Sequence, residues 1–372
     1  MPPLDEFSQG LEEIWSNRWL TNDGPVLRRF TAQLCNTFET DNLCLFNNGT
    51  LALQIALQGM EVSGEVITTP FTFVATTHAL FWNKIRPVFV DIEPDYYTLD
   101  PEKVEAAITP WTTAILATHV YGHPCALNKL ADIARRHNLK LLYDAAHAFG
   151  VNIGNQSIAH FGDLSMFSFH ATKLFHSLEG GMLIFRDSGL KSKFDYLKNF
   201  GFKNEVEVVM PGTNAKMNEF QALMGIQVLG YLNEIVARRI KIAELYRDRL
   251  RDVPGIRLTP PLPSEIKYNY AYMPIEIDEQ EFGMDREALY ARLKEWNVYT
   301  RRYFYPLVCD FACYRNVTVN GPLTVARRAA ERILTLPIYD GLELSEVEAI
   351  CEIVKFLQTQ NVPAHRMGSS VG

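Results

Sequence analysis

Short apolar runs alternate with helical patterns between about residue 43 and residue 185. The apolar runs include LCLF, EVITT, PVFVD, TAILATHV, LKLLYD, DLSMFSF and GMLIFR, and helix-like segments such as TLALQIALQGM and ALNKLADIARRHN lie between several of them. Strands that alternate with helices are typical of a sheet that is covered on both faces. The pattern therefore predicts an α/β fold built on a mainly parallel sheet.

A long helical pattern follows between residues 214 and 250, with Phe220, Leu223 and Met224 at helical spacing. It is interpreted as a connector to a second unit. After the Pro-rich VPGIRLTPPLPSEI, the run YAYMPIEI and the helix-like DREALYARLKEWN and SEVEAICEIVKFL predict a smaller α+β segment. The boundary between the two domains falls between residues 235 and 260. We therefore expect a large domain of residues 1–245, which includes the N-terminal segment, and a small domain of residues 246–372.

Composition narrows the possible partners and locations. The 372 residues are 47% hydrophobic, and their formal charge of -7 comes with no basic run that could follow a nucleic-acid backbone. The start MPPLDEFSQG lacks the features of a signal peptide, and no apolar stretch is long enough to cross a bilayer. We therefore expect a cytoplasmic protein with neither nucleic acid nor a membrane as partner.

The cysteines and histidines predict no metal site. The six cysteines contain no CxxC pair, so free thiols in a reducing cytosol are expected rather than disulfides or zinc. No HExxH motif or Cys/His cluster occurs. The chain also lacks a GxGxxG after its first strand and a GxSxG, the signatures of dinucleotide binding and of α/β-hydrolases.

The stretch LCLFNNGTLALQIAL places a turn with Gly49 and Thr50 between a strand and a helix. Backbone N–H groups at a helix start favour a phosphate, and a glycine allows close approach. The alternative is an ordinary turn in which Thr50 caps the helix.

Asp144 ends the apolar strand LKLLYD, at the edge where open α/β sheets bind ligands. Its carboxylate could pair with a protonated ring nitrogen, or it could simply cap the next element. His147 could contact the same ligand or be structural.

Lys173 and Ser168 follow the next strand, DLSMFSF, at the same sheet edge. A desolvated lysine amine can attack a carbonyl and form a Schiff base, whereas an ordinary lysine would extend into water. A phosphate cradle, a carboxylate for a pyridinium nitrogen and an amine for an aldehyde together indicate pyridoxal phosphate.

The sequence resembles the DegT/StrS family of nucleotide-sugar aminotransferases over nearly its whole length. The matching stretches are, in order, TNDGPVLRRF, NNGTLAL, TTPFTFVATTHAL, PVFVDIEPDYYTLDPEKVEAAI, THVYGHP, DAAHAFG, SFHATKLFHSLEGG and LPIYDGL. The resemblance implies a fold-type I enzyme that depends on pyridoxal 5'-phosphate, with a mainly parallel sheet in the large domain and a smaller α+β C-terminal domain.

The resemblance also implies roles around the cofactor ring. Lys173 would hold pyridoxal phosphate as a Schiff base and then move protons, with pyridoxamine 5'-phosphate as intermediate. Asp144 would pair with the pyridinium nitrogen, His147 would contact the ring hydroxyl, and Phe73 would stack on the ring.

Other matching positions concern the cofactor phosphate. Gly49, Thr50 and Ser168 correspond to phosphate contacts within one subunit. Asn214, in GTNAKMNEFQAL, matches a residue that reaches the phosphate of the neighbouring subunit. The resemblance thus implies a homodimer with shared active sites.

Two stretches concern the substrate. SFHATKLFHSLEGG is similar to the version in members that aminate C4 of the sugar, and RRYFYPL to that in enzymes acting on dTDP-4-keto-6-deoxy-D-glucose. The resemblance favours transfer of an amino group from L-glutamate, leaving 2-oxoglutarate, to C4 of dTDP-4-dehydro-6-deoxy-D-glucose or a related nucleotide-linked 4-keto-6-deoxy sugar. The alternatives are C3 amination of a 3-keto-6-deoxy sugar and a non-catalytic sensor that binds pyridoxal phosphate.

The product, dTDP-4-amino-4,6-dideoxy-D-glucose, would serve a surface polysaccharide such as the O-antigen of lipopolysaccharide, or a secondary metabolite. Arg302 and Tyr303 are candidates for contact with the sugar or the diphosphate. The family's common PLH reads PLV here, with Val308 in the histidine position, so a role of that histidine does not carry over.

Overall fold

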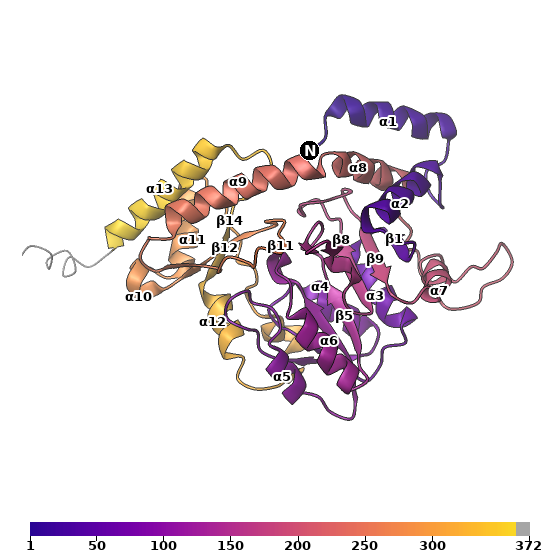
Figure 1. The fold of residues 1–372 in the computed structure, drawn as a ribbon, viewed down its shortest axis with the longest axis horizontal. Helices are drawn as coiled ribbons and strands as arrows, with labels where there is room; N and C mark the ends of the chain where they lie inside the picture. The colour runs from indigo at the N-terminus through magenta and orange to yellow at the C-terminus, as the bar shows by residue number, and fades with distance from the viewer. Residues whose placement is uncertain (362–372) are drawn as a thin grey trace, which may run out of the picture.

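An eight-stranded sheet forms the centre of the larger part of the protein in the computed structural model, which describes residues 1–361 (Figure 1). Its strands lie in the spatial order β1 (Leu43–Phe46), β9 (Gly181–Phe185), β8 (Leu164–Ser168), β5 (Lys140–Asp144), β4 (Thr112–Thr118), β2 (Glu65–Thr68), β3 (Arg86–Phe89) and β13 (Thr318–Val319). Only β9 runs antiparallel to its neighbours. The expected mainly parallel sheet is confirmed.

Helices cover both faces of this sheet, because successive residues of its strands point to opposite sides. Leu142, for example, packs with the first group of helices, whereas Leu141 and Tyr143 pack against the opposite face. The first face carries α3 (Gly49–Gly59), α4 (Val74–Trp82) and α7 (Leu190–Leu197). The second face carries α2 (Pro25–Phe38), α5 (Pro101–Ala106), α6 (Leu127–Arg136) and α8 (Glu219–Gly230), and α1 (Leu4–Asn17) packs along α8.

The long helical pattern is two helices rather than one. It divides at Tyr231 into α8 and α9 (Leu232–Leu250), and α9 extends from the large sheet toward a second, smaller sheet (Figure 1). The second sheet is antiparallel, in the order β10 (Ile256–Leu258), β12 (Met273–Ile277) and β14 (Ile333–Leu336). It shares an apolar core with α9, α11 (Arg286–Glu295) and α13 (Leu344–Asn361), which gives the expected α+β character.

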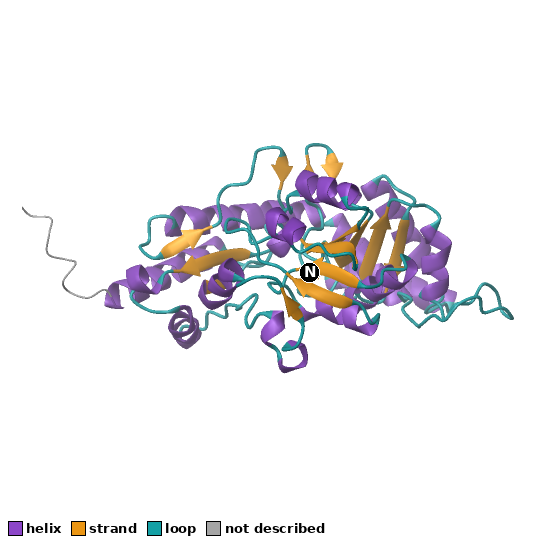
Figure 2. Ribbon diagram, turned by 90° about the horizontal axis from the view of Figure 1, so that it is seen from below, coloured by secondary structure: helices purple, strands orange, loops and turns teal. Residues whose placement is uncertain are grey.

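The two parts are joined by several contacts, and Figure 2 shows their sheets side by side along the long axis. The buried carboxylate of Asp91 accepts hydrogen bonds from the backbone N–H groups of Val325 and Ala326, at 2.9 and 2.8 Å, at the start of α12 (Thr324–Arg332). A shared apolar cluster includes Phe71 and Phe304. Segments after residue 246 therefore reach the large sheet, and residues 362–372 of the predicted small domain lie outside the described residues.

The remaining elements are short. They are a three-stranded sheet of β11 (Ile266–Lys267), β6 (Asn152–Ile153) and β7 (Gln156–Ser157), the helix α10 (Glu279–Phe282), and 3-10 turns at Val120–Gly122, Ile158–His160, Val308–Asp310 and Ala312–Tyr314. Among the helices of residues 1–361, none combines the length and apolar character needed to cross a bilayer.

Candidate active site

The carboxyl ends of three neighbouring strands meet at one edge of the large sheet. Thr118 ends β4, Asp144 ends β5 and Ser168 ends β8. All three line a cavity of about 210 Å³, which we call the Lys173 cavity. Eight of the ten predicted site residues border it: Gly49, Thr50, Phe73, Asp144, His147, Ser168, Lys173 and Tyr303.

Lys173 lies in the turn after β8, where its backbone N–H donates to the carbonyl of His170 at 2.8 Å. Its Nζ is 3.4 Å from the hydroxyl of Tyr272. Burial lowers the pKa of Lys173, and the nearby Asp144 and Tyr303 oppose this shift only in part. A lowered pKa increases the share of neutral amine, the form that can attack a carbonyl.

Asp144 is buried beside this amine and receives two hydrogen bonds. The hydroxyl of Thr76 donates to Oδ2 at 2.7 Å, and the backbone N–H of Ala146 donates to Oδ1 at 3.1 Å. Burial raises the pKa of Asp144, although these two donors and Lys173 lower it in part. Within residues 1–361 no cation lies at ion-pair distance from Asp144, so the carboxylate favours a ligand that carries an N–H⁺ group.

His147 faces the same cavity as a neutral ring. Its Nδ1 accepts the backbone N–H of Tyr121 at 3.1 Å, which leaves the hydrogen on Nε2. Burial, with Lys173 nearby, holds the pKa of His147 well below its usual value. The ring stacks on Phe304, with centroids 5.9 Å apart, and can therefore donate one fixed hydrogen bond to a ligand.

Gly49 and Thr50 lie at the N-terminus of α3, directly above the end of β8. The helix begins at Gly49 and its N-cap is Asn48, whose side chain accepts the N–H of Leu51 at 2.8 Å, so the alternative in which Thr50 caps the helix is wrong. A Cβ at Gly49 would lie 3.0 Å from Cβ of Ser168. The helix start therefore packs closely on the end of β8, and the backbone N–H groups of its first turn suit a phosphate.

Of the remaining predicted site residues, two line the cavity and two do not. Phe73, at the N-cap of α4, is 57% exposed at the mouth, and Tyr303 forms part of the wall. Arg302 is not a lining residue: it pairs with Glu287 at 2.8 Å. Asn214 also lies elsewhere, exposed, where Lys216 donates to it at 2.9 Å.

Sequence reasoning missed several lining residues. Tyr272 and Phe304 line the Lys173 cavity from segments about 100 and 130 residues later in the chain than Lys173. Tyr272 carries no local signal, whereas Phe304 lies in the stretch RRYFYPL beside Tyr303. Thr76, which binds Asp144 without lining the cavity, lies within the matching stretch TTPFTFVATTHAL, so the helix spacing from Phe73 could have indicated it. His170 and Glu179, which had no assigned role, form a pair at 3.5 Å on the cavity wall.

Val308 lies away from the Lys173 cavity. Its side chain is completely buried in the apolar cluster that contains Phe71 and Phe304, and its N–H donates to the carbonyl of Pro70 at 3.0 Å. The valine therefore fills a packing position beneath the site.

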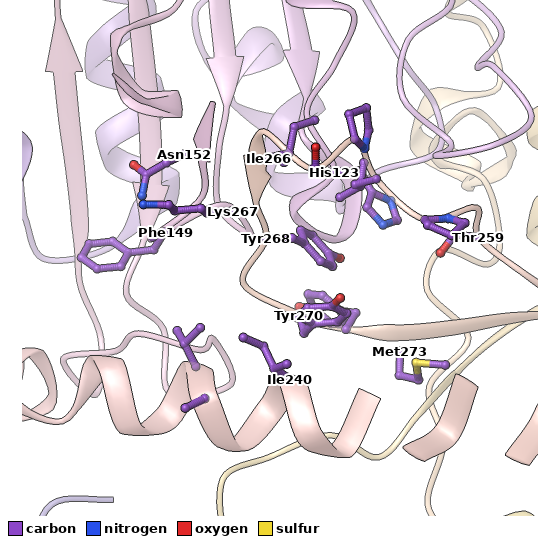
Figure 3. A pocket seen from close by; sticks show the side chains of 18 of the residues that line it. His123, Phe149, Asn152, Ile240, Thr259, Ile266, Lys267, Tyr268, Tyr270 and Met273 are labelled. Carbon is purple, nitrogen blue, oxygen red and sulfur yellow. The ribbon is translucent and has the colours of Figure 1, made fainter. Parts of the chain in front are cut away.

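A larger cavity, of about 800 Å³, borders the site only at Tyr272. Figure 3 shows the side chains of Tyr268, Tyr270 and, from α9, Ile240 around this space. Those of Lys267 and Asn152 lie to one side. None of the ten predicted site residues lines it. The convergence of titratable groups, rather than cavity size, identifies the Lys173 cavity as the candidate active site.

Comparison with known proteins identifies the class of site. The model of the DegT/DnrJ/EryC1/StrS aminotransferase family matches residues 4–355. The chain belongs to this family. Enzymes of the family are dependent on pyridoxal phosphate, and this confirms the cofactor and the aminotransferase class expected from the sequence.

Individual relatives are similar over almost their full length. The dTDP-4-amino-4,6-dideoxy-D-glucose transaminases of Shigella dysenteriae and Escherichia coli are both 42% identical, over 95% and 96% of this chain and 96% of each relative. The crystal structure of DesI with its TDP-sugar product has a TM-score of 0.91 at 34% identity, covering 97% of this chain and 91% of that chain. Helicobacter pylori PseC, an aminotransferase of pseudoaminic acid biosynthesis, has a TM-score of 0.90 at 26% identity, covering 96% and 98%.

The residues of the Lys173 cavity fit pyridoxal phosphate. Asp144 is a buried carboxylate without a cation in the described chain, as a pyridinium nitrogen requires. Lys173 offers an amine of lowered pKa for the aldehyde. The space at Gly49, which a Cβ would narrow, suits the phosphate at the start of α3.

Proposed function

We propose that this protein transfers the amino group of L-glutamate to C4 of dTDP-4-dehydro-6-deoxy-D-glucose and so forms dTDP-4-amino-4,6-dideoxy-D-glucose. The observation that carries the proposal is the pair of Lys173 and buried Asp144 at one cavity, in a chain 42% identical to transaminases of that amino sugar. The DesI structure with a TDP-sugar product supports the same nucleotide class.

Lys173 is proposed as the residue that moves the proton in both halves of the reaction. Pyridoxal phosphate supplies an aldehyde and an electron-accepting ring, which allow a C–H bond next to nitrogen to lose its proton. The lowered pKa of Lys173 increases the share of neutral Nζ, the form that can accept that proton. Tyr272, 3.4 Å from Nζ, orients the amine between transfers.

Asp144 and His147 are proposed to hold the ring. Asp144 would keep the ring nitrogen protonated, and the hydroxyl of Thr76 at 2.7 Å fixes the carboxylate for this task. The neutral His147, whose Nδ1 is already an acceptor, would donate from Nε2 to the ring hydroxyl. Phe73, at the mouth, would stack on the ring face and exclude water.

The phosphate contacts are proposed to come from two subunits. Gly49, Thr50 and Ser168 lie within one cavity, and their backbone and hydroxyl groups would hold the phosphate there. Asn214 is exposed and does not line its own chain's cavity, which supports a role across the interface of a homodimer.

The sugar nucleotide is proposed to enter beside Tyr303, which lines the cavity. The adjacent Arg302 stacks on Tyr290, with Cζ 4.5 Å from the ring centroid, so its guanidinium is oriented at the surface for the diphosphate. We further propose that the reaction takes place in the cytoplasm and that the amino sugar serves a surface polysaccharide such as O-antigen lipopolysaccharide.

Replacement of the lysine tests the central assignment. Lys173→Ala is expected to lower turnover of keto sugar and glutamate by about 1000-fold or more, because no other lysine of residues 1–361 lines the Lys173 cavity to carry the proton. Lys129→Ala, on the exposed face of α6, is the matched control and should keep the parental rate. A Lys173→Ala enzyme with the parental rate would show that another group carries the proton.

The substrate is tested with a panel of dTDP-, UDP- and GDP-linked 4-keto-6-deoxy sugars, with L-glutamate as donor. The dTDP sugar should be consumed with the highest kcat/KM, and NMR of the product should place the new amine on C4. An amine on C3 would contradict the proposal. A sensor would leave every sugar unchanged, and its visible absorption would not respond to glutamate.

A further inference from the structure

A second cavity meets the active site at Lys173. It measures about 670 Å³ and shares only Thr172 and Lys173 with the Lys173 cavity. Its other walls come from residues 1–3, from the turn of residues 171–176, from the end of α8, from α9 and from residues 338–340, and Figure 1 shows the N-terminus at the junction of α8 and α9. We call it the Arg239 cavity. None of the roles proposed above uses it.

Arg239, on α9, lines this cavity and is only 5% exposed. Its Nη1 donates to the carbonyl of Ala271 at 3.1 Å, and its buried Nε has no partner among the described residues. No carboxylate within residues 1–361 lies at ion-pair distance from it. A buried guanidinium without a counter-charge is costly to the fold, which points to an anion that arrives as a ligand.

Two other charged groups of the cavity, Asp340 and Arg238, are already paired, whereas Glu234 forms no ion pair among the described residues. Asp340, whose charge reaches Arg239 without an ion pair, is bound by the N-terminal amine of Met1 at 3.0 Å. The neighbouring Arg238 pairs with Glu343 at 2.9 Å. Arg239 is therefore the buried cation of this wall whose hydrogen-bonding capacity is unfilled.

A short chain of contacts connects Arg239 to the reacting amine. The carbonyl that holds Nη1 belongs to Ala271, the residue immediately before Tyr272. The hydroxyl of Tyr272 in turn lies 3.4 Å from Nζ of Lys173. Lys173 and Arg239 also line the same cavity, so a small molecule bound at Arg239 would share that space with the reacting amine.

We propose that Arg239 binds a carboxylate of the amino-acid donor while the donor nitrogen lies beside Lys173. The inference rests on the proposed function and deepens it by assigning the donor's own binding residue. An arginine fork holds a carboxylate through two hydrogen bonds. The keto sugar and its amino product carry no carboxylate, so Arg239 acts only in the half-reaction with the amino acid and makes no covalent bond.

Separate half-reactions test this assignment. Loaded enzyme is mixed with L-glutamate in one experiment and with dTDP-4-amino-4,6-dideoxy-D-glucose in the other, and the change in visible absorption is followed. Arg239→Met should lower the second-order rate constant for glutamate by about 100-fold, as expected for the loss of charge-assisted hydrogen bonds. The rate with the amino sugar should stay within about threefold of the parental rate.

Two further variants separate binding from folding. Arg239→Lys keeps the charge but not the fork, and should raise the half-saturating glutamate concentration about tenfold with a smaller effect on the limiting rate. Arg238→Met, in the same cavity wall, should leave both half-reactions at parental rates. Calorimetric titration with glutarate, which has no amino group, should detect binding to the parent and much weaker binding to Arg239→Met.

Each outcome bears on a different claim. Equal losses in the two half-reactions of both Arg239 variants would mean a structural role, and unchanged glutamate kinetics would mean no role; either result overturns the inference alone. A parent enzyme that reacts with neither compound would overturn the proposed function and this inference together.

Discussion

At the residue scale, burial acts in opposite directions on the two central ionisable groups. It lowers the pKa of Lys173 and raises that of Asp144, and in both cases it disfavours the charged form. The lysine gains a reactive neutral amine. The aspartate is left as a carboxylate that costs free energy to ionise until a protonated ring nitrogen binds it.

Asp144→Asn is therefore expected to stabilise the cofactor-free protein at neutral pH. Because the pKa of Asp144 is higher in the folded chain, its contribution to stability is fully present below its unfolded pKa, about 3.9, and is lost as the pH rises through the folded value. Asparagine does not ionise, so the variant does not lose this stability as the pH rises. The variant should unfold a few degrees above the parent at pH 7, and the difference should vanish near pH 4.

Thermal unfolding of the cofactor-free proteins across this pH range measures the effect. Asp252→Asn is the control, since its side chain is 92% exposed, and it should follow the parent at every pH. Catalysis should fall in Asp144→Asn even though the fold is more stable. A variant less stable than the parent at pH 7 would contradict the role of burial.

At the element scale, a buried carboxylate connects the helices of the second sheet face. Glu219, the first residue of α8, is 1% exposed and accepts the N–H groups of Val26 and Leu27 at 2.9 and 3.0 Å. These donors lie in the first turn of α2, where backbone N–H groups have no partner within the helix. Glu219 thus caps a helix from nearly 200 residues away.

Glu219→Ala should lower the free energy of unfolding by about 2–4 kcal/mol, because two buried N–H groups lose a charged acceptor. Urea denaturation measures the change as a lower midpoint. The control is Glu12→Ala, at an exposed position of α1, which should change the midpoint little. Equal midpoints for the two variants would show that water replaces the carboxylate at no cost.

The sequence predicted the strands of the large sheet well, because strands buried on both faces are continuous apolar runs. It did not reveal β13, Thr318–Val319, an exposed strand of two residues at the sheet edge. The direction of β9 was also not predicted, since an apolar run has the same composition in either direction. Contacts such as Glu219 with α2 leave no periodic signal at all.

The residues of the site also divide into those that the sequence predicts and those that it does not. Asp144, Ser168 and Lys173 could be placed from sequence because each ends or follows an apolar strand, and strand ends share one sheet edge. Tyr272 could not, because the small sheet and its loops bring it there from outside that pattern. The buried, unpaired state of Arg239 likewise depends on packing alone.

At the scale of the whole molecule, both parts of the chain contribute to one site. Tyr272 and Tyr303 line the Lys173 cavity together with residues of the large sheet. The boundary between domains of residues 1–245 and 246–372 stays a prediction. The hydrogen bonds from the start of α12 to Asp91 and the shared apolar cluster fix the two parts against each other around the cavity.

The loop that follows α7 extends away from the rest of the molecule (Figure 1). It includes Asn214 and exposes several apolar side chains, namely Phe200, Phe202, Val206, Val208 and Val209. Exposed apolar side chains that gather on one segment are typical of a protein interface. This loop therefore supports the proposed homodimer, in which Asn214 reaches the partner's cofactor.

Complementation between two defective subunits tests this arrangement. Lys173→Ala and Asn214→Ala chains carry different affinity tags, are co-expressed, and are purified on both tags so that only mixed dimers remain. One site of each mixed dimer then has an intact lysine and an intact asparagine, so about half of the parental activity should return. Each variant alone should be far less active.

Lys173→Ala combined with Asp144→Asn is the control, because each of these defects disables its own subunit's site and no intact site can form. A mixed dimer of Lys173→Ala and Asn214→Ala no more active than this control would place Asn214 outside the shared site, and a single 42.4 kDa species in sedimentation would exclude the dimer itself.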